Sequence, residues 1–140
     1  MSTSERVLKS WIHMLISVNG ERAVTNITYN EAVICNVLMH AEQEITATDL
    51  CHIMKMQKSQ MNRTLTTMEE RRMIQRNRSL SDKRQIIIVL NDASDNPYYQ
   101  EHERIVKYVD RLLDHFGVDK IEDIIQLFDY ISKIAQEEKV

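Results

Sequence analysis

Glycine and proline are scarce in this sequence, with two glycines and one proline among 140 residues. Sandwiches and barrels built only from strands need many tight turns, where these two residues are the usual occupants. Their scarcity argues against such folds and favours long helices. Apolar residues still make up 43% of the chain, enough for a hydrophobic core. At this length we expect one domain, or one lobe with an appendage for self-association.

Cysteine is also scarce, and long apolar runs are missing. The two cysteines, Cys35 and Cys51, come without a secretory segment, which fits a reducing compartment better than a disulfide. No run of about 18 apolar residues could span a membrane. We therefore expect a cytoplasmic protein without a membrane partner. Both thiols are interpreted as buried structural residues, and a thiol-based redox switch is kept as an alternative.

The usual signatures of enzymes are absent from the sequence. It contains no nucleophile-elbow glycines, no phosphate-binding loop and no paired-carboxylate constellation. Its five histidines are scattered without the spacing of metal ligands. We expect a protein that is not an enzyme and that needs no cofactor and no metal.

Positive charge is concentrated in one stretch of the chain. Residues 55–84 carry nine Lys or Arg against three Asp or Glu, a local charge of +6 in a chain of −3. The rest of the chain therefore has a charge of −9. This uneven distribution of charge indicates a patch that binds polyanions, on a protein whose remaining surface repels them. Nucleic acid is the leading candidate partner.

Periodicity and capping residues predict the helices. A first helix is expected over 4–18, ended by Asn19 and Gly20. Thr28 with Glu31, and Thr46 with Asp49, have the spacing of capping boxes that open the second and third helices. A fourth helix should start near Gln57, with its inner face formed by three apolar residues at helical spacing: Met61, Leu65 and Met68.

The second half of the chain predicts a hairpin and two more helices. The pattern becomes extended from Met73, a turn follows over 79–82, and 85–90 is almost entirely β-branched. Pro97 can occupy the first position of a long helix that Gly117 closes, and a last apolar-striped helix follows. The fold class is thus mainly α with a small β-hairpin wing. We assign 28–91 to a winged helix-turn-helix lobe, and 1–20 with 97–140 to dimerisation helices. The alternatives are an intramolecular three-helix bundle, which would bury these apolar stripes only in part, and a monomer with loose terminal helices.

The outer face of the fourth helix is the first candidate DNA-binding surface. If the apolar residues face inward, the opposite face and the first turn present short polar, amide and basic side chains. Such groups pair with base edges in the major groove or hold phosphates. The assigned residues are Lys58, Ser59, Gln60, Asn62, Arg63 and Thr66.

The hairpin is the second candidate surface. A narrow tip can enter the minor groove, where negative potential attracts arginine. Four cations belong to the hairpin: Arg76, Arg78, Lys83 and Arg84. Asp82 is interpreted as a structural partner of a neighbouring cation. The alternative is a charged edge strand protected against aggregation.

These residues resemble a known family. The segment 45–91 looks like the winged helix of the MarR family of bacterial transcriptional regulators. Members usually show lysine-serine entering the recognition helix, leucine-glutamate-glutamate at its end and aspartate-x-arginine at the wing tip. Three motifs occupy those places in register: Lys58-Ser59, Met68-Glu69-Glu70 and Asp82-Lys83-Arg84. Two departures stand out, because Arg72 replaces a common glycine and Asn91-Asp92-Ala93-Ser94 replaces the usual threonine and glycine.

The resemblance implies a homodimer that binds a pseudo-palindromic, double-stranded operator and usually represses. Many members release DNA when a small phenolic ligand, an oxidant or a metal acts near the helix junctions. An apolar effector pocket near Trp11, Met14 and Met39 is therefore one expectation, although these side chains also suit a core. The rival to DNA binding is a winged-helix module that binds an acidic protein.

Overall fold

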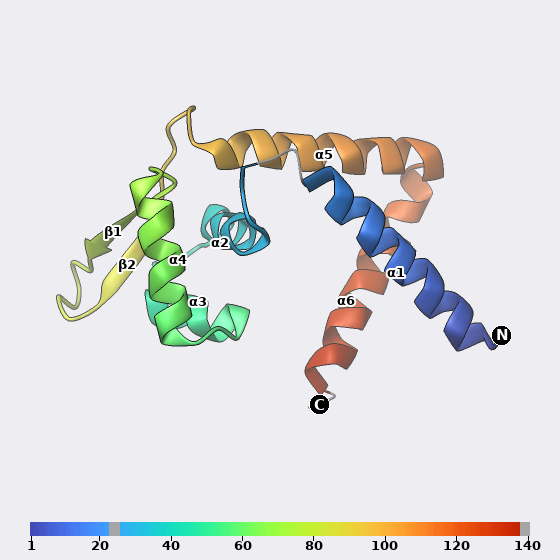
Figure 1. The fold of residues 1–140 in the computed structure, drawn as a ribbon, viewed down its shortest axis with the longest axis horizontal. Helices are drawn as coiled ribbons and strands as arrows, with labels where there is room; N and C mark the ends of the chain where they lie inside the picture. The colour runs from blue at the N-terminus through green and yellow to red at the C-terminus, as the bar shows by residue number, and fades with distance from the viewer. Residues whose placement is uncertain (23–25, 138–140) are drawn as a thin grey trace. The chain divides into compact units, whose positions relative to one another are not determined.

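The fold is known from a computed structural model, which describes residues 1–22 and 26–137. It confirms the mainly α fold with one hairpin (Figure 1). The helices are α1 (Thr3–Arg22), α2 (Tyr29–Met39), α3 (Ala47–Met54), α4 (Lys58–Glu70), α5 (Pro97–Phe116) and α6 (Ile121–Glu137), with a short 3-10 helix η1 (Val118–Lys120). The strands are β1 (Ile74–Arg78) and β2 (Ile86–Leu90).

The predicted end of the first helix is wrong. Helix α1 continues through Asn19 and Gly20 and ends at Arg22. A single glycine inside a helix costs about 1 kcal/mol relative to alanine, which the neighbouring turns can offset. A glycine therefore weakens a helix without being a reliable stop.

Both predicted capping boxes are present. Thr28 Oγ1 accepts a hydrogen bond from Glu31 N at 3.2 Å, and Thr28 N donates to Glu31 Oε1 at 2.9 Å. Thr46 and Asp49 repeat this exchange at the start of α3, at 3.0 and 2.9 Å. Each box satisfies backbone N–H groups that the first turn of a helix leaves unpaired. The starts of α2 and α3 are therefore set by local sequence.

The hydrophobic core lies between the helices of the winged lobe and the hairpin. The inner residues of α4, which are Met61, Leu65 and Met68, are fully buried as predicted. They share the core with residues from every neighbouring element: Ile34, Cys35, Leu50, Met73, Ile74, Ile88 and Tyr98. Figure 1 shows α2, α3 and α4 gathered beside the hairpin.

The hairpin is antiparallel and is joined to the segment that precedes α3. Arg76 lies opposite Ile88, and Arg78 opposite Ile86. On the other side of β2, Ile88 N donates to Ile45 O at 2.8 Å, beside an isolated bridge between Thr46 and Ile87. The wing is thus held between α4 and the α2–α3 connection.

The C-terminal helices carry apolar faces that remain exposed. Helix α5 begins at Pro97 as predicted, and Gly117 follows its end with a φ of 83°, a conformation that favours glycine. In α6, Phe128 is 57% exposed, and Ile125, Ile131 and Ile134 are at least 40% exposed. The chain divides into two compact units, Met1–Glu101 and His102–Val140. Within the described residues, no helix combines the length and apolarity needed to cross a bilayer.

Candidate nucleic-acid interface

Helices α3 and α4 form the helix-turn-helix. Lys55 ends α3 in the left-handed conformation, with φ 53° and ψ 43°, and Met56 N donates to Cys51 O at 3.1 Å. This compact turn brings the chain back so that α4 packs against α3. Lys55 occupies a conformation in which non-glycine residues are uncommon, and its side chain is exposed.

The outer face of α4 is polar and exposed. Every residue assigned to it from the sequence is exposed: Lys58, Ser59, Gln60, Asn62, Arg63 and Thr66. The first turn contains no acidic residue, and Gln57 caps the helix without a side-chain hydrogen bond. The backbone N–H groups of that turn and the positive end of the helix dipole thus face no protein carboxylate in the first turn.

Three threonines of α4 turn their hydroxyl groups back onto their own helix. Thr64, Thr66 and Thr67 donate to the carbonyl oxygens of residues 60, 62 and 63, at 2.9, 2.8 and 3.1 Å. Thr66 Oγ1 also accepts a hydrogen bond from Arg76 Nη2 at 3.2 Å. The Thr66 hydroxyl is therefore already engaged within the protein, and this bond places the predicted helix surface directly beside the wing.

Arg76 links the wing to the end of α4. Its Nη2 forms an ion pair with Glu69 Oε1 at 3.1 Å, and its backbone N donates to Glu69 Oε2 at 2.9 Å. This backbone hydrogen bond, followed by the bonds from the guanidinium, lowers the pKa of Glu69. Arg76 thus lies in the predicted wing, while its charge is compensated inside the lobe.

The tip of the wing is organised around a buried serine. Ser79 is 2% exposed, and its Oγ accepts from Ser81 N and Asp82 N at 3.3 and 3.4 Å and donates to Glu44 Oε2 at 3.2 Å. Asp82 Oδ1 pairs with Arg84 Nε at 3.3 Å, which confirms its interpretation as a structural partner. The Arg84 side chain is nevertheless 92% exposed.

Most cations of the basic stretch remain available to a ligand. Arg71, Arg76 and Arg84 form ion pairs with acidic side chains. Within the part of the chain that the structure describes, the other six form none, and all six are exposed: Lys55, Lys58, Arg63, Arg72, Arg78 and Lys83. Arg78 Nη1 donates to Lys83 O at 2.9 Å, so its side chain lies along the hairpin tip. The helix-turn-helix and the wing thus each carry exposed cations that form no ion pair within the described residues.

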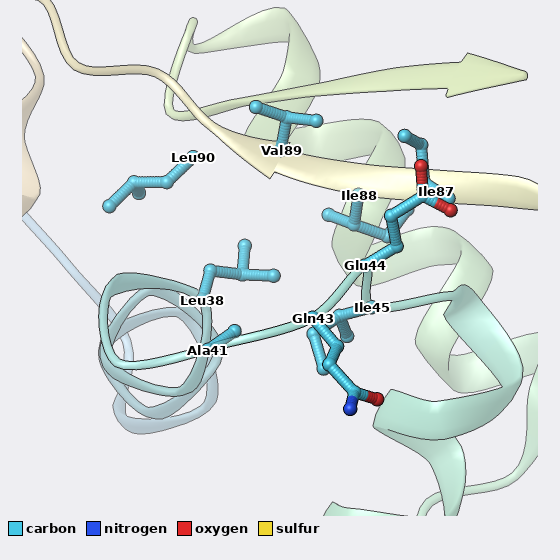
Figure 2. A pocket seen from close by; sticks show the side chains of 9 residues that line it. All are labelled: Leu38, Ala41, Gln43, Glu44, Ile45, Ile87, Ile88, Val89 and Leu90. Carbon is cyan, nitrogen blue, oxygen red and sulfur yellow. The ribbon is translucent and has the colours of Figure 1, made fainter. Parts of the chain in front are cut away.

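The residues of the predicted effector pocket are not assembled around a described cavity. Trp11 and Met14 on α1 are about half exposed, whereas Met39 packs against the core and its Sδ accepts a bond from Tyr98 Oη at 3.8 Å. A different pocket lies between the end of α2, the α2–α3 connection and β2 (Figure 2). Its volume is about 170 Å³. Sites for drug-sized ligands usually occupy roughly 300–1,000 Å³.

The cysteines differ in environment. Cys35 is fully buried on α2, and burial, followed by the nearby charge of Glu31, raises the pKa of its thiol to about 12. Cys51 on α3 is only partly buried, so the prediction of two buried cysteines holds fully for Cys35 alone. A thiol that stays protonated at neutral pH is a poor redox sensor.

Sequence reasoning missed the side chains that brace the end of α4. Arg71, Asn91 and Asn96 all bond to groups far away in the sequence. In the sequence, Arg71 is indistinguishable from the other cations of the basic stretch. No local signal identifies such pairs, since capping and periodicity report on neighbours within a few residues.

Comparison with known proteins gives a family match and a consistent set of similar folds. The sequence model of the family described as "Transcriptional regulator SarA/Rot" matches residues 21–108, more than half of the chain. A comparison with curated proteins finds no significant match.

Several solved structures share the fold over nearly the whole chain. The transcriptional repressor CouR bound to a 23-mer DNA duplex has a TM-score of 0.71 at 17% identity, covering 94% of this chain and 92% of that one. A mutant of MepR from S. aureus has a TM-score of 0.73 at 15% identity, covering 96% and 99%. AbsC, a MarR family transcriptional regulator from Streptomyces coelicolor, has a TM-score of 0.69 at 20% identity, covering 98% and 95%.

Proposed function

Because this chain belongs to the SarA/Rot family of transcriptional regulators, we propose that it binds an operator in double-stranded DNA as a homodimer. It is a transcriptional regulator of the MarR/SarA winged-helix type. The observation that carries the proposal is the joint surface of α4 and the wing. There, exposed amide and basic side chains lie together with cations that form no ion pair in the part of the chain that the structure describes.

The two parts of this surface have different tasks in the proposal. Asn62 and Arg63 on α4 read base edges in the major groove, where Asn can pair with adenine and Arg with guanine through two hydrogen bonds. Lys58 and the first-turn N–H groups hold phosphates. Arg78, Lys83 and Arg84 reach the minor groove from the wing tip. Arg76 supports the wing through Glu69.

A homodimer is supported by the apolar faces outside the winged lobe. Leu8, Trp11, Ile12 and Leu15 of α1 are 46–52% exposed, and α6 presents a similar stripe. Burial against a second copy removes this apolar surface from water, which is the main favourable term in association. Two recognition helices about one helical turn of DNA apart then match the two halves of a pseudo-palindrome. Sedimentation velocity at micromolar concentration should give a dimer, and a monomer would contradict this part.

Repression in the bacterial cytoplasm is the proposed outcome, since CouR is described as a transcriptional repressor. We also predict that a small apolar or phenolic effector binds near Trp11, Met14 and Met39 and releases the protein from DNA. Phenolic compounds tested one by one should quench Trp11 fluorescence and weaken DNA binding together if the site exists. Unchanged fluorescence and unchanged DNA binding with every compound would contradict the predicted effector site.

The experiment that tests DNA binding is a salt titration. Fluorescence anisotropy is measured on a labelled duplex from the promoter next to the protein's own gene, with a scrambled duplex as control. If about eight phosphates are neutralised per dimer, the slope of log K against log salt should be near −7. A slope near zero, or retention of an acidic protein instead of DNA, would overturn the proposal.

A matched pair of variants sharpens the test. Lys58→Ala removes a cation from the proposed phosphate contacts, so it should weaken binding and flatten the slope by about 2 units per dimer. Lys107→Ala removes an exposed cation of α5, which pairs with Glu103 at 3.0 Å. Lys107→Ala should leave affinity and slope unchanged. Equal effects of the two substitutions would mean that the positive charge of α4 has no special role.

A further inference from the structure

The end of α4 is bonded to both chain segments that connect the winged lobe to the flanking helices. Three consecutive residues, Arg71, Arg72 and Met73, form what we call the exit corner. Asn26, which lies in the connection from α1 to α2, bonds to one end of it, and Asn91 and Asn96, which lie between β2 and α5, bond to the other. These segments are far apart in sequence and meet at three residues.

Arg71 fastens the corner to the start of α2. Its Nη1 donates to both carboxylate oxygens of Glu31, at 3.2 and 3.1 Å, and its Nη2 donates to Asn26 O at 2.7 Å. The Glu31 side chain is only 4% exposed and also accepts the Thr28 N–H of the capping box. A buried carboxylate that loses its arginine is left with an uncompensated charge, so this link is costly to open.

The two asparagines fasten the corner to the start of α5. Asn91 Nδ2 donates to Arg72 O at 2.6 Å, and Asn91 N donates to Met73 O at 3.0 Å. Asn96, which is 2% exposed, donates from Nδ2 to Met73 O at 3.0 Å and to Asn91 O at 2.7 Å. Its Oδ1 accepts the N–H of Tyr98 in the first turn of α5 at 3.1 Å. One buried amide therefore joins the end of α4 to the first turn of α5.

The backbone of the exit corner, just after the end of α4, is held in one conformation by hydrogen bonds. Arg72 is held at φ 59°, a conformation that costs a non-glycine residue energy. Its carbonyl and that of Met73 accept three hydrogen bonds from Asn91 and Asn96. Strained backbone persists where the surroundings over-determine it, as these bonds do.

We propose that the exit corner is a positioning joint that sets the direction of α4 relative to the connections towards α1 and α5. In a dimer held together by those helices, the joint determines the separation of half-sites that the two α4 helices can read. Arg71, Asn91 and Asn96 are then positioning residues, which act through α4 without touching DNA. This inference rests on the proposed function, since it assumes DNA binding by a dimer.

The test measures selectivity for half-site spacing. Anisotropy is recorded on three duplexes with the same half-sites, separated by the native spacing, by one base pair less and by one base pair more. One base pair shifts a half-site by about 3.4 Å and rotates it by about 35°. The wild-type protein should prefer the native spacing by about tenfold or more.

Two variants open the joint from opposite sides. Arg71→Met retains an apolar stem but removes the bonds to Glu31 and Asn26, and Asn91→Ala removes the side-chain bond to Arg72 O. Both should bring the three affinities close together, and Arg71→Lys should restore part of the preference. Arg84→Ala is the control, because loss of an exposed wing cation should weaken binding to all three duplexes alike.

The outcomes separate the two proposals. A folded Asn91→Ala variant that retains the full preference would overturn the joint, even where Arg71→Met fails to fold. Thermal melts by circular dichroism show which variants are folded. A wild-type protein that binds DNA but ignores spacing would also overturn the joint, whereas one that binds none of the duplexes would overturn the proposed function itself.

Discussion

Glu69 in the last turn of α4 accepts hydrogen bonds from both the backbone and the side chain of Arg76 on β1. The three donors are Arg76 N at 2.9 Å, Nη2 at 3.1 Å and Nε at 3.3 Å. The carboxylate thus fixes the strand that begins the wing to the helix that precedes it. It also forms an ion pair with one arginine of the basic stretch.

Acid should weaken this link between helix and wing. The backbone and side-chain bonds from Arg76 lower the pKa of Glu69 below its ordinary value of 4.5. A lowered folded-state pKa gives stability that is present above pH 4.5 and lost as the pH falls through the folded-state pKa. Urea unfolding between pH 7 and pH 3 should therefore show a decline below pH 4.5 that Glu69→Gln makes shallower. An equally steep decline in Glu69→Gln would contradict this role.

Arg72→Gly should stabilise the fold. The left-handed conformation at φ 59° costs a non-glycine residue about 1–2 kcal/mol, which glycine would avoid. The larger conformational entropy of glycine in the unfolded chain offsets part of this stabilisation. A net increase of about 0.5–1 kcal/mol in the free energy of unfolding is expected. Arg72→Ala is the matched control, since it removes the same charge and keeps the strain. Equal stability of the two variants would show that the conformation carries no cost here.

Local sequence predicted those parts of the lobe that depend on neighbouring residues. Helical spacing and capping motifs, which involve residues only a few positions apart, were sufficient to predict three features. These are the caps at Thr28 and Thr46, the buried face of α4 formed by Met61, Leu65 and Met68, and the start of α5 at Pro97. The other features depend on contacts between residues far apart in the sequence.

The pairing of Arg71 with Glu31 joins residues 40 positions apart. No short-range pattern marks that ion pair, and Arg76 could not be distinguished in sequence from the uncompensated cations around it. The candidate surface was therefore predictable as a helix face and a basic tip. The long-range hydrogen bonds of the exit corner were not predictable.

The two thiols should differ strongly in reactivity. Burial raises the pKa of Cys35 to about 12, so its thiolate is scarce at pH 8, whereas Cys51 is partly exposed. A disulfide reagent such as DTNB should modify one thiol per native chain rapidly, and both in urea. Cys51→Ala should abolish the rapid phase. Rapid labelling of Cys35 in folded Cys51→Ala protein would contradict the buried environment and reopen a redox switch.

Substitutions on α4 and at the wing tip should change DNA binding in different ways. Asn62 and Arg63 lie on the exposed face of α4, where a side chain that pairs with a base contributes about 1–3 kcal/mol of discrimination at one position. Asn62→Ala and Arg63→Ala should therefore weaken binding and relax the preference for particular bases. Arg84→Ala removes a side chain that is 92% exposed at the tip, and should lower affinity for most sequences alike.

Binding to a randomised operator pool, followed by sequencing of the retained DNA, measures both effects at once. Gln100→Ala, at an exposed position of α5, is a control that should change neither affinity nor base preference. Because phosphate contacts carry no sequence information, an unchanged base preference in both Asn62→Ala and Arg63→Ala would place α4 along the DNA backbone instead of in the groove. A base preference altered by Arg84→Ala alone would move sequence readout from α4 to the wing.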